Sequence, residues 1–214
     1  MIASNESYFK ICLIGDTQVG KISLLSTTSG KDFKELSEPT IGVAFDFFNL
    51  NVDDTSVKVQ VWDLAGRDEF KEIVKKYLNL AGAILLVYDV TNRQSFISID
   101  SWLSVIQGGV EKEVQMVLVG NKCDQDKREV TYEEGLQKAE SYGLLYIETY
   151  AKNSLNAVEA FNLVISKVKA EDLEKKFQKI IDDGFQLSTK IAKTADCDTC
   201  FWTKAQFEDP QECA

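Results

Sequence analysis

The sequence predicts an α/β fold in which a mostly parallel, six-stranded sheet is covered by helices on both faces. Apolar runs of strand length alternate with segments of helical periodicity from about residue 8 to about residue 169. This alternation is typical of a parallel sheet with covering helices. Of the 214 residues, 44% are hydrophobic, which is enough to build one substantial core.

The elements follow one another in a regular order. Strands are expected at residues 8–14, 43–52, 56–62, 83–89, 115–120 and 144–147. Helices are expected at residues 21–30, 68–80, 93–108, 131–141 and 155–169. The turn Asp53-Asp54-Thr55 joins the second and third strands and predicts an antiparallel hairpin at one edge. Ligands of such sheets bind beyond the carboxyl ends of the strands, so the site is expected there.

Composition and charge exclude several classes of function and partner. The net charge of −10 argues against nucleic acid as a partner and against a basic membrane patch. The chain has no histidine, which excludes histidine catalysis and histidine metal sites. Five cysteines, an odd number, and the lack of a signal peptide predict a reducing, cytoplasmic compartment. No apolar run approaches the length of a membrane span.

A glycine-rich stretch between the first strand and the first helix reads as a phosphate loop. It comprises Gly15, Asp16, Thr17, Gln18, Val19, Gly20, Lys21, Ile22 and Ser23. Backbone N–H groups at such a helix start can cradle an anion, and Gly15 and Gly20 let the backbone approach a phosphate closely. Lys21 supplies a point charge for terminal phosphates. The alternative is a glycine turn before a helix, with an incidental lysine.

Polar residues after the other strands are expected to meet the same site. Asp63 can hold Mg²⁺ directly or through water, and the N–H of Gly66 can meet a terminal phosphate. In Asn121-Lys122-Cys123-Asp124, the Asp124 carboxylate can accept two N–H groups from a guanine edge, a donor pair that adenine lacks. A backbone N–H in the stretch Tyr150-Ala151-Lys152 can meet the guanine carbonyl oxygen. Each stretch alone also fits a turn or a helix cap; their order and spacing favour one nucleotide site.

Six stretches together carry a family resemblance. They are GDTQVGK from residue 15, PTIGVAF from 39, WDLAGRDEF from 62, YDVTNRQSF from 88, VGNKCD from 119 and ETYAKN from 148. Residues 8 to about 169 resemble a Ras-superfamily small GTPase and are most similar to the Rab family. The resemblance implies a three-layer P-loop small-GTPase fold. It also implies a GTP/GDP-binding switch with Mg²⁺ that hydrolyses GTP and acts in vesicle trafficking.

The resemblance also assigns roles to residues and surfaces. Phe33 would stack on guanine, and Thr40 would meet Mg²⁺ and the terminal phosphate. Two segments, roughly 33–43 and 64–80, would be mobile. Effector, exchange-factor and activating proteins would bind through residues 33–48 and 64–80. The residues implied in catalysis are Lys21, Thr40, Gly66 and Arg67.

Ile22 departs from the family, which has serine or threonine there to bind Mg²⁺. Isoleucine offers no oxygen, and Ser23 lies about 100° further around a helix. The expected metal ligands are therefore Thr40 and Asp63, the latter partly through water, and the ion is expected to be weakly held. The alternative is that Ile22 is a packing residue that the site tolerates.

Arg67 is the second departure, because the family has a glutamine that orients the attacking water. An arginine has donors only, so slow intrinsic hydrolysis is expected. A contrary interpretation is that Arg67 stabilises transition-state charge as an arginine finger does. Together the two departures leave an alternative function open, a non-cycling nucleotide-binding pseudo-GTPase that acts as an interaction scaffold.

The C-terminal part follows the predicted GTPase domain of residues 1–169. Residues 170–184 predict a helical extension with an apolar stripe, to be buried on the domain, on a partner or in a self-dimer. Residues 185–214 predict a flexible tail. It ends Gln211-Glu212-Cys213-Ala214, neither a paired-cysteine nor a Cys-a-a-X ending, so the sequence leaves peripheral vesicle-membrane attachment open. Cys197 and Cys200 lack the second ligand pair of a zinc knuckle.

Overall fold

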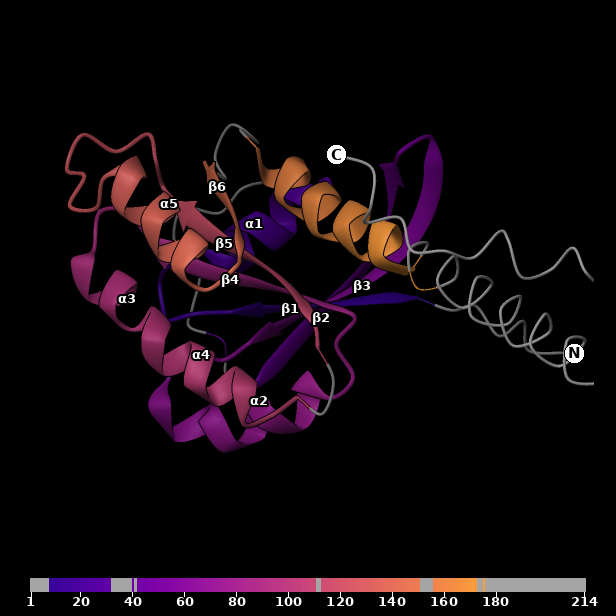
Figure 1. Cartoon of the computed structure of the whole chain (residues 1–214), viewed down its shortest axis with the longest axis horizontal. Coiled ribbons are helices and arrows are strands. Elements are labelled where there is room, and N and C mark those ends of the chain that lie inside the picture. The colour runs from indigo at the N-terminus through magenta and orange to yellow at the C-terminus, as the bar shows by residue number, and fades with distance from the viewer. Residues whose placement is uncertain are drawn as a thin grey trace, which may run out of the picture. The chain divides into compact units, whose positions relative to one another are not determined.

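A single six-stranded sheet with helices on both faces organises the chain (Figure 1). The computed structural model describes residues 8–31, 40, 42–110, 113–150, 156–172 and 175. The strands are β1 (Phe9–Ile14), β2 (Val43–Val52), β3 (Thr55–Leu64), β4 (Ala83–Asp89), β5 (Gln115–Asn121) and β6 (Leu145–Thr149). Their order is β2-β3-β1-β4-β5-β6, with β2 antiparallel to β3 and all other neighbours parallel. This confirms the predicted fold class.

The helices are close to the expected positions. They are α1 (Lys21–Thr28), the 3₁₀ turn η1 (Asp68–Phe70), α2 (Lys71–Leu78), α3 (Arg93–Ile97), α4 (Ile99–Gln107), α5 (Tyr132–Ser141) and a last helix at residues 157–172. The single helix expected at residues 93–108 is interrupted at Ser98. The Ser98 hydroxyl donates to the Gln94 carbonyl at 3.0 Å, and such a bond to the preceding turn often bends a helix.

Two apolar layers lie on the two faces of the sheet because side chains alternate along each strand. Ile11 and Leu13 pack with residues of α1 and of the helix at 157–172. Cys12 and Ile14 pack with residues of α2, α3, α4 and α5. In Figure 1, α2 and α4 accordingly lie on one side of the sheet and the orange helix at 157–172 on the other. The central strand β4 is buried over its whole length, so it forms a rigid base for the loops at its carboxyl end.

The β2–β3 hairpin is confirmed as the antiparallel edge of the sheet. Asp53 and Asp54 both have positive φ, at 49° and 58°, as a two-residue turn of this hand requires. The hairpin also meets the last helix. Ser166 donates its hydroxyl to the Asp53 carboxylate at 3.0 Å, and Lys169 donates to the Val52 carbonyl at 3.0 Å. The first compact unit of the chain runs to Ala170.

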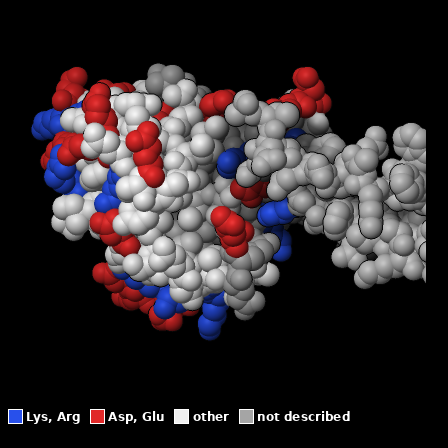
Figure 2. Space-filling view, viewed as in Figure 1, with Lys and Arg blue, Asp and Glu red and all other residues white. Residues whose placement is uncertain are grey.

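Acidic and basic side chains are interspersed on the face shown in Figure 2. Among the described residues, oppositely charged side chains form ion pairs, including Arg93–Glu134 at 2.8 Å, Arg128–Glu148 at 2.7 Å and Lys138–Asp100 at 2.8 Å. Among the residues that the structure describes, no helix combines the length and the apolarity that crossing a bilayer requires. Most of the predicted extension and all of the tail lie outside the described residues, so the domain boundaries remain predictions.

Candidate functional site

The phosphate loop connects β1 to α1 and is held in a tight conformation. Gly15 has φ 143° and Gly20 has φ 96°. A Cβ on Gly15 would lie 2.0 Å from the Val87 carbonyl oxygen, and one on Gly20 would lie 2.2 Å from Asn121 Nδ2. Only glycine fits at these two points. No described side chain caps the start of α1, so its first N–H groups are free to face an anion.

Lys21 is drawn into the loop. Its side chain is buried, and Nζ donates to the carbonyls of Gly15 at 2.8 Å and Asp16 at 2.7 Å. Burial lowers the pKa of the Lys21 ammonium, and the nearby carboxylates of Asp63 and Asp16 oppose this. The loop therefore encloses a cation whose present acceptors are carbonyl dipoles. A phosphate group in the loop would supply the opposite charge that these carbonyls lack.

Asp63 and Thr40 bring two kinds of oxygen together beside Lys21. Asp63 is fully buried near the end of β3, and its Oδ2 accepts from the Thr40 hydroxyl at 2.5 Å. Its Oδ1 has no hydrogen-bond partner among the described residues. Burial raises the pKa of Asp63, while Lys21 and the Thr40 bond lower it. A buried carboxylate oxygen without a partner is rare and calls for a cation or a water.

These oxygens fit Mg²⁺, a hard cation that takes one or two protein oxygens and fills its shell with phosphates and waters. Ile22 is the second residue of α1, and its side chain contributes no oxygen. The described residues thus offer the metal one carboxylate and one hydroxyl. The expectation that Ile22 weakens the ion's hold remains a prediction.

Gly66 lies directly against the phosphate loop, whereas the side chain of the next residue, Arg67, is exposed and pairs with an acidic neighbour. A Cβ on Gly66 would come within 2.4 Å of the Asp16 carbonyl carbon and 2.5 Å of the Thr17 nitrogen. The Arg67 side chain is 54% exposed, and its Nη1 lies 3.5 Å from Glu69 Oε1. The residue at the expected water-orienting position is thus engaged by an acidic neighbour at the surface.

At the other end of the site, Asn121 ties three segments together. It is buried, donates Nδ2 to the Val19 carbonyl at 2.8 Å and accepts from the Thr149 hydroxyl at 3.0 Å. Lys122 follows with a positive φ of 64°. Its Nζ donates to the Gln18 carbonyl at 2.8 Å and pairs with Asp89 Oδ2 at 2.6 Å. The ends of β4, β5 and β6 are therefore bound to the phosphate loop by side chains.

Asp124, the predicted reader of guanine, has an exposed side chain that accepts from Gln125 Nε2 at 2.8 Å. Tyr150 follows β6 and is partly exposed. Phe33, Ala151 and Lys152 lie outside the described residues, so their roles stay predictions.

Three residues of the site were not expected from the sequence. Thr149 is the last residue of β6 and Asp89 is the last residue of β4. A polar residue at the carboxyl end of a strand was the signal in the sequence that could have identified them. Trp102 of α4 donates its indole N–H to Asp16 Oδ1 at 2.8 Å. In an apolar helix a tryptophan reads as core, so nothing in the pattern marked it.

Comparison with known proteins gives a consistent result. The Ras family model matches residues 10–170 of the chain. The Ras-related protein RABA6b of Arabidopsis thaliana is 44% identical over 177 residues, 82% of this chain and 76% of that protein. The Ras-related protein Rab-8A of Bos taurus is 36% identical over 192 residues, 89% of this chain and 92% of that protein. The human Ras-related protein Rab-8B is 38% identical over 185 residues, 86% of this chain and 87% of that protein.

Proposed function

The chain belongs to the Ras family and is a Rab-like small GTPase, and we propose that it is a GTP/GDP-binding switch of intracellular vesicle trafficking with slow intrinsic hydrolysis. One observation carries the proposal. Asn121 Nδ2 bonds to the Val19 carbonyl at 2.8 Å, which brings the expected base-reading loop against the phosphate loop. A base and a phosphate chain bound at these two loops would belong to one nucleotide.

Base recognition would rest on Asp124. Its exposed carboxylate is an acceptor at the edge where a guanine would present two N–H groups. Asn121 and Lys122 would hold the loop in place, since both are bonded to the phosphate loop. The family resemblance adds Phe33 as a stacking residue and the backbone of Ala151 as a donor to the guanine carbonyl.

The phosphates would be held by the loop N–H groups, by Lys21 and by the N–H of Gly66. Mg²⁺, when bound, would neutralise charge on the phosphate oxygens. Asp63 and Thr40 would hold it, as the unpartnered Asp63 Oδ1 supports. Because Ile22 supplies no oxygen, we propose that the ion is held weakly and that its removal affects nucleotide binding less than in a serine- or threonine-bearing relative.

Slow hydrolysis is proposed from the chemistry of Arg67. Its guanidinium has no acceptor for a water hydrogen, and its Nη1 lies 3.5 Å from Glu69. An arginine finger would instead have to leave Glu69 and turn toward the terminal phosphate. The exposed position favours the first interpretation.

Partner proteins would dock on residues 33–48 and 64–80. The described part of this surface includes Phe45 and Phe47, which are 62% and 46% exposed on the edge strand β2. Trp62 and Tyr77 make an edge-to-face pair close to the same region, with ring centroids 5.2 Å apart. A contiguous exposed apolar patch marks an interaction site, and the rings of Phe45 and Phe47 are neighbours, with centroids 5.6 Å apart. We place the protein in the cytoplasm, and its peripheral attachment to vesicle membranes stays open.

A second candidate function is a non-cycling nucleotide-binding scaffold. Both departures from the family, Ile22 and Arg67, are at positions expected to serve the phosphates, the metal and the attacking water. The residues expected to read the base, in contrast, are present. Loss of turnover with binding retained would give this pattern.

The proposal is tested by titrating the purified protein with fluorescent GDP, GTP and ADP and then following one turnover of GTP by chromatography. We expect binding of both guanine nucleotides and GTP conversion on the order of 10⁻⁴ per second or slower. Binding without any conversion would favour the scaffold. Equal affinity for ADP would contradict the assignment.

A further inference from the structure

Trp102 of α4 contacts the phosphate loop although it lies far from that loop in the sequence. Its indole N–H donates to Asp16 Oδ1 at 2.8 Å across a separation of 86 residues. Trp102 is buried, and a buried indole N–H needs an acceptor. A hydrogen bond to a carboxylate is stronger than one between neutral groups. The side chain of Asp16 is therefore fixed by a residue outside its own loop.

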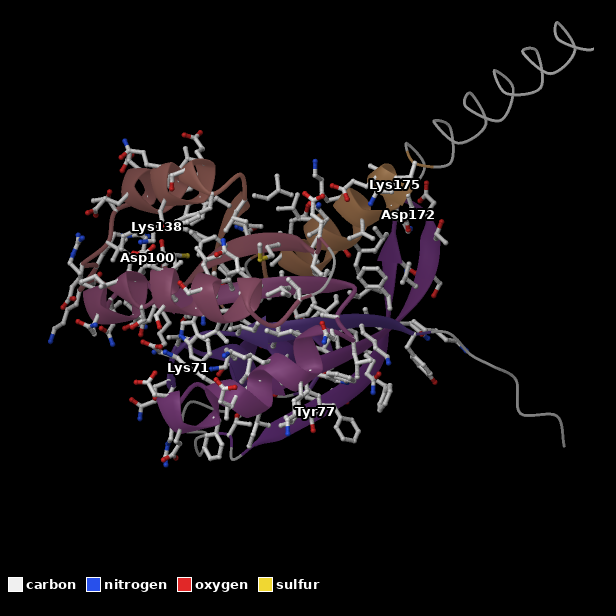
Figure 3. All side chains as sticks on the ribbon, turned by 60° about the horizontal axis from the view of Figure 1, so that its bottom comes forward. Lys71, Tyr77, Asp100, Lys138, Asp172 and Lys175 are labelled. Atoms are coloured by element: carbon white, nitrogen blue, oxygen red, sulfur yellow. The ribbon has the colours of Figure 1, made fainter. Side chains whose placement is uncertain are left out.

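A face of the Trp102 ring meets the beginning of α2. Lys71 Nζ lies 5.1 Å from the centroid of the Trp102 ring. The same Nζ donates to the Ser101 hydroxyl at 2.8 Å and pairs with Asp68 Oδ1 at 2.7 Å. Figure 3 shows Lys71 at the junction of α2 and α4. One ammonium thus joins η1, the first turn of α2 and the tryptophan ring.

The chain between η1 and β3 touches the same loop residue directly. Gly66 approaches Asp16 so closely that an added Cβ would lie 2.4 Å from the Asp16 carbonyl carbon. The Asp16 carbonyl oxygen also accepts from Lys21 Nζ at 2.7 Å. Asp16 is consequently contacted from two directions, by Gly66 on its backbone and by Trp102 on its carboxylate.

We propose that Trp102 is a positioning residue that couples the phosphate loop to the first turn of α2, through Asp16 on one side and Lys71 on the other. A displacement of the segment from Gly66 to Lys71 changes the support of Asp16. Because Asp16 also holds Lys21, that change reaches the group placed to meet phosphate. The consequence for nucleotide release rests on the proposed function, whereas the coupling itself needs no ligand.

The coupling is tested by amide hydrogen exchange without added nucleotide. Trp102→Phe keeps an aromatic ring under Lys71, removes the N–H donor and makes the buried side chain smaller. We expect about tenfold faster exchange in residues 15–21, the scale of one hydrogen bond to a charged group. Asp16→Ala is expected to give the same change, and the double variant no more than either single one. Lys71→Met, which removes the charge, is expected to speed exchange in residues 66–72 and, less strongly, in residues 15–21.

Trp62→Phe is the matched control, since it makes the same chemical change in a ring that packs on Tyr77 instead. It is expected to leave exchange in residues 15–21 unchanged. Additive effects in the double variant would overturn the proposal. So would a uniform rise across β4 and α5 in Trp102→Phe, which would mean that Trp102 only supports the core.

A second measurement connects the coupling to the nucleotide. Release of fluorescent GDP is expected to be about tenfold faster from Trp102→Phe than from the wild type. A wild-type protein that binds no guanine nucleotide would refute the proposed function, and the exchange comparison would still decide the coupling. Binding with equal release rates would refute the link to release.

Discussion

The two ends of the site differ in how completely the protein satisfies its own polar groups. At the base end, Asn121 bonds to Val19 and Thr149, and Lys122 bonds to Gln18 and to a buried carboxylate. At the phosphate end, the buried Asp63 Oδ1 has no partner among the described residues. The base end is thus assembled by protein contacts, and the phosphate end has a group that a ligand or ion would complete.

The family departures fall at the incomplete end. Ile22 follows Lys21 and Arg67 follows Gly66 in the chain, and the family resemblance predicts oxygen-bearing side chains at both positions. In the proposed function, the site therefore combines a preassembled part that would read the base with an altered part that would hold the metal and the attacking water. Changes at the base end should affect binding, and changes at the phosphate end should affect the metal and the turnover.

The largest effect is expected from Asp124→Asn. The asparagine amide has one acceptor oxygen and one donor NH₂ group. One of the two guanine N–H groups therefore loses its acceptor. We expect roughly 10⁴-fold weaker GDP binding, as for a site whose hydrogen-bond match is removed, together with improved binding of the xanthine nucleotide.

Competition titration with GDP and the xanthine analogue measures this change. Asp126→Asn, a nearby exposed aspartate, is the matched control and should leave both affinities as they are. Unchanged discrimination in Asp124→Asn would show that the base is read elsewhere.

The contact between the two ends of the site, where Gly20 of the phosphate loop meets Asn121, is tested by Gly20→Ala. The new Cβ would lie 2.2 Å from Asn121 Nδ2 at a backbone φ of 96°. Backbone strain and the loss of the contact with Asn121 should together lower the free energy of unfolding by about 3 kcal/mol.

Urea denaturation measures the loss, with Gly30→Ala as the control. Gly30 has φ 75° and open space at its Cβ position, so only backbone strain of about 1–2 kcal/mol applies. Equal losses in the two variants would mean that the contact with Asn121 contributes nothing.

Ile22→Ser is expected to sharpen the difference at the phosphate end. It supplies a hydroxyl at the position where the family resemblance implies a metal ligand, so Mg²⁺ should bind about tenfold or more tightly, on the scale of other changes around bound metals. Fluorescent-nucleotide release with and without a chelator measures this.

The wild type should respond weakly to the chelator and Ile22→Ser strongly. Ile22→Val, which changes packing without adding oxygen, is the matched control. A large chelator effect already present in the wild type, and unchanged in Ile22→Ser, would make Ile22 a packing residue only.

The smallest effect is expected from Arg67→Gln. The amide can orient a water that the guanidinium cannot, so single-turnover GTP hydrolysis should rise several-fold, up to about tenfold. Glu69→Gln removes only the neighbouring charge and should change the rate less. Slower hydrolysis in Arg67→Gln would identify Arg67 as a catalytic group.

The sequence was sufficient to predict the fold, and it indicated the edge of the sheet at which the candidate site residues lie. Alternating and helical periodicities differ enough to place every strand, and polar residues after strands mark the edge where a parallel sheet binds ligands. The turn Asp53-Asp54-Thr55 between two strand-like segments was enough to predict the hairpin, because such short polar turns join neighbouring antiparallel strands.

The long-range contacts were beyond sequence reasoning. The bond between Trp102 and Asp16 spans 86 residues, and a tryptophan in an apolar helix gives no sign of its partner. The ion pair of Lys122 with Asp89 likewise depends on which strands are neighbours. The interruption at Ser98 depends on a hydroxyl orientation that helical periodicity does not encode.

The central claim is that the preassembled base end holds a guanine nucleotide despite the altered phosphate end. Mass spectrometry of the nucleotide released when the purified wild-type protein is denatured tests it most directly. The account predicts guanine nucleotide, stoichiometric with the protein, and no adenine nucleotide. A folded protein that releases no nucleotide and takes up no added GDP, or one that releases adenine nucleotide, would contradict it.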